Sequence, residues 1–135
     1  MDDDIDYSLL KQNTIKKYWD ESGIYKQESI QYIKKCKRYN RSNYEVKSIL
    51  VLTTHALYIF EEKSNLLKVR ISFHEIKAIA QSTYSKQFVL KFDLKDDERL
   101  HMEDREEILN FILMRFPSFC PDLNLNVYDI PEKDL

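Results

Sequence analysis

The residues best suited to chemistry in this sequence are six cations that lie close together: Lys34, Lys35, Lys37, Arg38, Arg41 and Lys47. Lysine and arginine carry positive charge and donate hydrogen bonds, so they suit carboxylate and phosphate groups. Between residues 11 and 47 there are ten Lys or Arg and four Asp or Glu, although the whole chain has a net charge of −2. The sequence predicts a local surface for a lipid headgroup or a protein partner, with an ordinary solvated surface as the alternative.

Other chemistry is weakly represented. His55, His74 and His101 are scattered and show no metal-ligand spacing, and Cys36 and Cys120 form no metal or disulfide pattern. The chain has one glycine, Gly23, which disfavours a glycine-rich phosphate loop. We therefore predict a protein that is not an enzyme and holds no metal or cofactor, with structural or surface histidines and reduced cysteines.

The cations must be positioned by β-strands. A strand is expected from residue 30, followed by a polar turn at 40–43 and further strands at 46–53, 56–61, 66–73, 76–82, 87–94 and 99–102. In the fourth strand we expect Leu67, Val69, Ile71 and Phe73 to share one face. The period then changes to that of a helix over 103–116, with an apolar stripe and Pro117 as its end. A helix over 2–19 is expected before the strands, with Gly23 at or after its end.

This order predicts one α+β, mainly β domain: a pleckstrin-homology-like barrel of about seven antiparallel strands capped by a C-terminal amphipathic helix. The expected organisation is an N-terminal helical extension at 1–28, the barrel domain at 29–117 and an extended tail at 118–135. The sequence contains no apolar run long enough to span a bilayer. We expect a cytoplasmic protein.

Several segments resemble the tail homology domain of class-I myosins, here as a stand-alone module. Residues 39–44, 49–53 and 56–58 resemble the lipid-binding hairpin region of that family, and residues 69–76 resemble its arginine-isoleucine strand. The resemblance covers roughly residues 33–114. It implies a pleckstrin-homology-like core that binds anionic phospholipids, with Lys37, Arg41 and Lys47 as headgroup contacts. Glu45 and Val46 stand where the family usually has more cations, which weakens the lipid-site prediction more than the fold prediction.

Three functions are compatible with these patterns. The first is a non-catalytic protein-interaction or scaffold module, a small subunit of a cytoskeletal or ciliary assembly. The second is phosphoinositide or anionic-membrane binding through the basic first hairpin, where each cation near an acidic surface contributes about 1 kcal/mol. Nucleic-acid binding by stacking on Tyr32, Tyr39 and Tyr44 is the weakest reading, because the sequence pI is about 5.9.

Overall fold

The computed structural model describes residues 10, 12–22 and 28–131. Its elements follow in this order: α1 (Gln12–Ser22), β1 (Ile30–Tyr39), β2 (Glu45–Thr53), β3 (Ala56–Glu61), β4 (Leu67–Ser72), the 3-10 turn η2 (Phe73–Glu75), β5 (Ala78–Ser82), β6 (Gln87–Lys91), β7 (Glu98–His101), α2 (Arg105–Phe119) and β8 (Asn126–Ile130). The predicted strands and the helix after them are present in the predicted order. The predicted fold class, a mainly β domain with a C-terminal helix, is confirmed.

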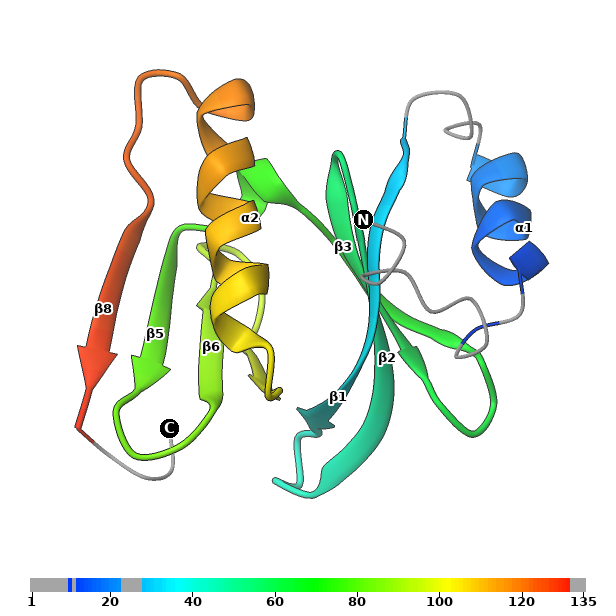
Figure 1. Cartoon of the computed structure of the whole chain (residues 1–135), viewed down its shortest axis with the longest axis horizontal. Helices are drawn as coiled ribbons and strands as arrows, with labels where there is room; N and C mark the ends of the chain where they lie inside the picture. Colours follow the sequence, from blue (N-terminus) through cyan, green and yellow to red (C-terminus); the bar gives the residue numbers. More distant parts are fainter. Residues whose placement is uncertain (1–9, 11, 23–27, 132–135) are drawn as a thin grey trace.

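The strands form one sheet in the order β4-β3-β2-β1-β7-β6-β5-β8. Neighbours pair antiparallel from β4 to β5, whereas β8 lies parallel to β5. Figure 1 shows β8 beside β5, and α1 and α2 on opposite sides of β1 and β2. The tail after the helix was expected to be extended, and within it residues 126–130 form this added strand.

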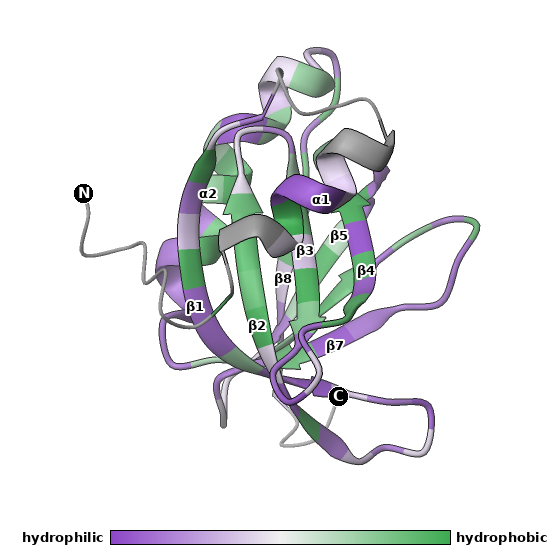
Figure 2. Ribbon diagram, turned by 90° about the vertical axis from the view of Figure 1, so that its right-hand side faces the viewer, coloured by the Kyte–Doolittle hydropathy of each residue, from purple (hydrophilic) through white to green (hydrophobic). Residues whose placement is uncertain are grey.

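Two apolar clusters lie on the two faces of the β1–β4 part of the sheet. The inner cluster includes Leu50, Leu57 and Ile71 and is covered by α2. The outer cluster includes Val51 and Phe60 and is covered by α1. Figure 2 shows β2 and β3 hydrophobic over most of their length beneath α1. A strand buried on both faces reads as a continuous apolar run, which explains the run at 49–52.

The expected single face of β4 is interrupted by a bulge. Val69 pairs with Ile59, but the next pair along the strands joins Leu67 to Phe60, so Lys68 is the extra residue. Val69 consequently packs against the inner cluster, and Leu67 packs against the outer one. The prediction that Leu67 shares a face with Val69 is therefore wrong, because a one-residue shift moves a side chain to the other face of the sheet.

Helix α2 buries its predicted apolar stripe, including Ile108, Ile112 and Phe116. The expectation that Pro117 ends the helix is wrong, because α2 continues to Phe119. Proline lacks an N–H of its own, but the hydrogen bond from the Cys120 N–H to the Phe116 carbonyl, beyond the proline, is present at 2.9 Å. The helix therefore tolerates this proline in its last turn.

Helix α1 confirms the helical N-terminal extension within the described residues. Ile15 and Trp19 are buried against the outer cluster. The expected helix start at residues 2–4 and the expected stop at Gly23 lie outside the described residues. α1 gives the outer face of the sheet its cover, so this face is a second core and not a solvent-exposed surface.

Candidate functional site

The predicted cationic hairpin consists of β1, β2 and the turn at 40–44. Asn40 Oδ1 accepts hydrogen bonds from the backbone N–H groups of Ser42 and Tyr44, each at 3.0 Å. Asn43 adopts φ 66°, a left-handed conformation that asparagine tolerates better than most residues. Local polar contacts thus hold the tip of the hairpin.

Strand alternation divides the six predicted cations into separate groups. Lys37 lies opposite Lys47, and Lys35 lies opposite Ile49 of the outer cluster, so these three lysines share the outer face. Lys34 and Arg38 project to the inner side, and Arg41 lies in the turn. The six cations therefore do not form one site.

On the inner side Arg38 makes a two-bond ion pair with Glu98 at the start of β7. Arg38 Nε donates to Glu98 Oε1 at 2.8 Å, and Nη2 donates to Oε2 at 3.1 Å. Donating these hydrogen bonds to the Glu98 carboxylate raises the pKa of Arg38 above its ordinary value, against the opposing effect of burial. A bidentate pair of this kind compensates the charge of the guanidinium, which lowers its attraction for another anion.

Two further cations of the set are also paired with carboxylates. Lys34 Nζ lies 3.4 Å from Asp104 Oδ2 and 3.7 Å from Glu107 Oε2, at the start of α2. Arg41 Nη2 donates to Asp96 Oδ2 at 3.1 Å, across the gap between the first hairpin and the β6–β7 loop. Lys34 therefore anchors α2, and Arg41 links two loops.

The outer lysines surround a cavity of about 270 Å³ that we call the outer pocket. Its lining residues are Lys35, Cys36, Lys37, Lys47, Glu62, His101, Met102 and Glu103. Lys37 is 3.4 Å from Glu45, and Lys35 is 3.9 Å from Glu62. Lys47 forms no ion pair with any residue that the structure describes. The outer pocket thus keeps a lysine available for an external anion.

Glu45, the residue that departs from the family pattern, carries a negative charge beside the outer pocket. The Tyr39 hydroxyl donates a hydrogen bond to Glu45 Oε1 at 3.0 Å. This hydrogen bond, together with the nearby Lys37, lowers the pKa of the Glu45 carboxyl below its ordinary value. Glu45 therefore remains ionised at neutral pH and offsets part of the positive charge of Lys37.

A second cavity, of about 330 Å³, opens on the inner side among the loops, and we call it the loop pocket. Its lining residues are Arg38, Tyr39, Asn40, Arg41, Lys68, Val69, Ile71, Phe92, Lys95, Asp96, Asp97 and Glu98. Each of its four cations contacts a carboxylate: Arg38 contacts Glu98, Arg41 contacts Asp96, Lys68 contacts Glu61 and Lys95 contacts Glu75. The charges of the loop pocket are balanced within the molecule.

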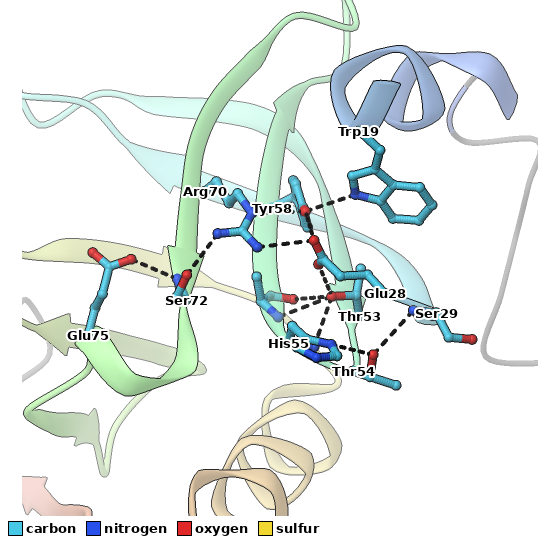
Figure 3. Close-up of polar contacts among 11 residues, drawn as sticks. Trp19, Glu28, Ser29, Thr53, Thr54, His55, Tyr58, Arg70, Ser72 and Glu75 are labelled. Atoms are coloured by element: carbon cyan, nitrogen blue, oxygen red, sulfur yellow. Dashed lines mark hydrogen bonds and ion pairs between the residues drawn. The ribbon is translucent and has the colours of Figure 1, made fainter. Parts of the chain in front are cut away.

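A buried polar network behind α1 was not predicted (Figure 3). Glu28, just before β1, accepts hydrogen bonds from Tyr58 at 2.8 Å, Thr53 at 2.6 Å and Arg70 at 3.1 Å. Tyr58 in turn accepts from the Trp19 indole at 2.9 Å and the Arg70 Nε at 2.9 Å. Burial raises the pKa of Tyr58 to about 12. The network satisfies buried polar groups and fastens α1 to the sheet.

Two of the other residues considered for chemistry, Cys36 and His55, have structural positions. Burial raises the pKa of the Cys36 thiol to about 12, so at neutral pH it is not a thiolate nucleophile. The His55 ring packs edge-on against Phe119, with ring centroids 5.6 Å apart. Within residues 10, 12–22 and 28–131 no three His, Cys, Asp or Glu side chains converge as metal ligands. Neither described helix is long and apolar enough to cross a membrane.

The sequence matches a family model over residues 4–129, described as the unconventional myosin tail, actin- and lipid-binding. A search of curated proteins gave no match. The family model matches a longer part of the chain than the sequence motifs that resemble the tail homology domain, which cover roughly residues 33–114.

Solved structures with the same fold include three with low sequence identity. The C-terminal domain of an unknown protein from Leishmania infantum has a TM-score of 0.62 at 16% identity, with 78% of this chain and 96% of that chain covered. The hSac2 domain of the human phosphoinositide phosphatase Sac2 has a TM-score of 0.60 at 12% identity, with 93% of each chain covered. The N-terminal PH domain of human ARAP2 has a TM-score of 0.56 at 12% identity, with 70% of this chain and 85% of that chain covered. These likenesses confirm the pleckstrin-homology-like fold.

Proposed function

The chain belongs to the unconventional myosin tail family, a family of protein- and lipid-binding modules, and from this premise we propose that it is a non-catalytic subunit that docks on actin filaments. The observation that carries the proposal is the charge balance of the loop pocket, where every lining cation contacts a carboxylate of the same chain. A pocket built for a lipid phosphate keeps its cations available. A balanced pocket suits a protein surface, which brings both signs of charge and apolar groups.

Exposed apolar side chains at the same end of the barrel support the proposal. The loops β1–β2, β3–β4 and β6–β7 share this end, because each pair of neighbouring strands is antiparallel. Each of these loops carries one large exposed side chain: Tyr44 is 71% exposed, Leu66 is 59% exposed and Leu94 is 98% exposed. These three side chains place exposed apolar groups on loops at one end of the sheet, where a partner surface can contact them. We call these three loops the loop end.

The carboxylates near Leu94 are balanced by cations of the same chain. Asp93 pairs with Lys77, Asp96 with Arg41 and Asp97 with Lys91. The loop end therefore presents both signs of charge and not the net positive charge that attracts an acidic membrane. A surface with both signs of charge suits a protein partner.

Pelleting with filamentous actin tests the proposal. We expect the purified chain to sediment with filaments and the Leu94→Asp variant to bind about tenfold more weakly, as expected for an interface anchor. Met114→Asp is the matched control, because Met114 is 78% exposed on α2, away from the loop end. Failure of the wild-type chain to pellet, or equal weakening by both substitutions, would contradict the proposal.

The outer pocket supports a second candidate function, binding of phosphoinositide or another anionic lipid. It gathers Lys35, Lys37 and Lys47 on one face, with His101 opposite Lys37 on β7. Lys47 has no carboxylate partner among the described residues. A few cations near an acidic surface give weak, reversible attachment, which a second contact such as actin would reinforce. Pelleting with vesicles that contain phosphoinositide tests this candidate.

A further inference from the structure

The loop pocket combines an apolar floor with a rim of charges already paired. Val69, Ile71 and Phe92 line it and also belong to the inner cluster or pack against it. The ion pairs Arg38–Glu98 and Arg41–Asp96 lie on the side of the pocket formed by β7 and the β6–β7 loop. We propose that this pocket receives an apolar side chain, aromatic or large aliphatic, from the protein partner, and not a phosphorylated headgroup. This inference rests on the proposed docking function and names its anchor point.

The ion pairs argue against a phosphate in this pocket. A phosphate that reached Arg38 would have to displace Glu98 from two hydrogen bonds of 2.8 Å and 3.1 Å. The Glu98 side chain is only 13% exposed, so the displaced carboxylate would be left buried beside a new negative charge. Asp96 and Asp97 line the same pocket and pair with Arg41 and Lys91, so a phosphate would have to compete with them for these cations. The pocket therefore disfavours anions despite its four cations.

The floor favours an apolar occupant. The side chains of Val69 and Phe92 are partly exposed, so the pocket has apolar surface that an occupant can bury. The Lys95 ammonium lies 5.2 Å from the centroid of the Phe92 ring, and its contact with Glu75 holds the lysine in place. A volume of about 330 Å³ admits one large side chain. Hot spots at protein interfaces are commonly single aromatic residues seated in such pockets.

The surroundings specify the rest of the partner segment. Leu94 directly precedes Lys95, and Leu66 comes shortly before Lys68, so both exposed leucines border pocket-lining residues. A contact around the anchor that includes these leucines excludes water from it. Because the rim carries both signs of charge, the anchor is best flanked by both acidic and basic residues. The occupant is therefore a protein segment with one apolar anchor between mixed charges.

Small probes test this inference on the full chain. With methyl-labelled Ile, Leu and Val, N-acetyl-tryptophanamide at millimolar concentration should shift the methyl resonances of Val69 and Ile71 in a saturable way. The methyl groups of Ile108, on the buried face of α2, are the internal reference and should not shift. Inositol 1,4,5-trisphosphate, the headgroup probe, should leave the Val69 and Ile71 signals unchanged. Larger shifts of these signals with the trisphosphate, or none with the tryptophan amide, would overturn the inference.

Two variants are used, so that the test does not depend on one variant that could misfold. Phe92→Ala removes part of the floor and should weaken binding of the tryptophan amide about fivefold or more. Leu94→Asp changes only a residue that is 98% exposed, so it keeps the fold and should weaken the amide more modestly. An unchanged affinity in both variants would also overturn the inference.

Actin pelleting separates the two proposals. Loss of the amide response with pelleting still sensitive to Leu94→Asp would reject the anchor pocket and keep the docking function. A clear amide response in a chain that ignores filaments would reject the actin function and keep the pocket.

Discussion

The guanidinium of Arg38 in β1 and the carboxylate of Glu98 in β7 join these two strands through two hydrogen bonds. The residues are 60 positions apart in the chain, and Arg38 lies opposite Leu100 of β7 in the short ladder between β1 and β7. This ion pair both fastens the junction of the sheet and neutralises a cation of the predicted hairpin. Stability and specificity therefore depend on the same contact.

Replacing Glu98 with Gln should lower the free energy of unfolding by about 1–3 kcal/mol, because Arg38 stays partly buried without its charged partner. Urea denaturation followed by circular dichroism measures this change. Asp96→Asn is the matched control, since the Arg41 and Asp96 side chains are 94% and 80% exposed. The control should change stability by less than about 0.5 kcal/mol. Equal effects of the two substitutions would contradict the role given to Glu98.

Replacing Tyr58 with Phe should lower the free energy of unfolding by about 1–3 kcal/mol, because buried polar groups lose a partner. The groups left without the hydroxyl are Trp19 Nε1, Arg70 Nε and Glu28 Oε2. Chemical denaturation read by the fluorescence of the single tryptophan measures the change directly at α1. Tyr18→Phe, at a ring that packs edge-on against Tyr58, should be nearly neutral. A neutral Tyr58→Phe would show that the network is not stabilising.

Alkaline pH should destabilise the fold. Burial raises the pKa of Cys36 from 9.0 and that of Tyr58 from 10.0, each to about 12. The unfolded chain therefore releases these protons at a lower pH than the folded chain, so the free energy of unfolding falls as the pH rises above 9 and continues to fall until about 12.

Urea denaturation at about pH 8 and about pH 10.5 checks this decline. Cys36→Ala removes the thiol contribution, so this variant should lose less stability between the two pH values than the wild-type chain loses. Parallel declines in the two proteins would contradict the assignment to Cys36.

Charge reversal in the outer pocket should weaken attachment to acidic vesicles. We expect Lys37→Glu with Lys47→Glu to lower pelleting with phosphatidylinositol 4,5-bisphosphate vesicles about tenfold or more, since each cation contributes about 1 kcal/mol. The matched control is Lys63→Glu with Lys77→Glu, two exposed lysines that do not line the outer pocket. Arg41→Glu should have a small effect, because Arg41 lines the loop pocket. If the double reversal binds as the wild-type chain does, the outer pocket is not the lipid site.

Most of the fold could be predicted from local patterns. Alternating residues and polar turns predicted the strands from β1 to β7, and the stripe of Ile108 and Ile112 predicted α2. The strand β8 was missed because its five residues have no clear alternation, and its pairing with β5 supplies what its own sequence lacks. The bulge at Lys68 was missed because it depends on which residue of β3 lies opposite.

The candidate site could be predicted only in part. The cluster of cations was visible, but their partners Glu98 and Asp96 are 60 and 55 positions away, so the charge balance required the fold. The buried network behind α1 left one signal that could have been used. The continuous apolar run of β2 indicated that both faces of the sheet are covered, so a charged residue such as Arg70 on the outer side needed a buried partner.

The parallel pairing of β8 with β5 also determines when the edge of β5 can be covered during synthesis on the ribosome. Ala78 of β5 pairs with Asn126, so the edge of β5 stays open while all the residues between them, including α2, are translated. During that interval the nascent chain presents an unpaired strand edge, which is a template for pairing with other chains. The edge of β5 is therefore covered only after residues 126–130 have been translated.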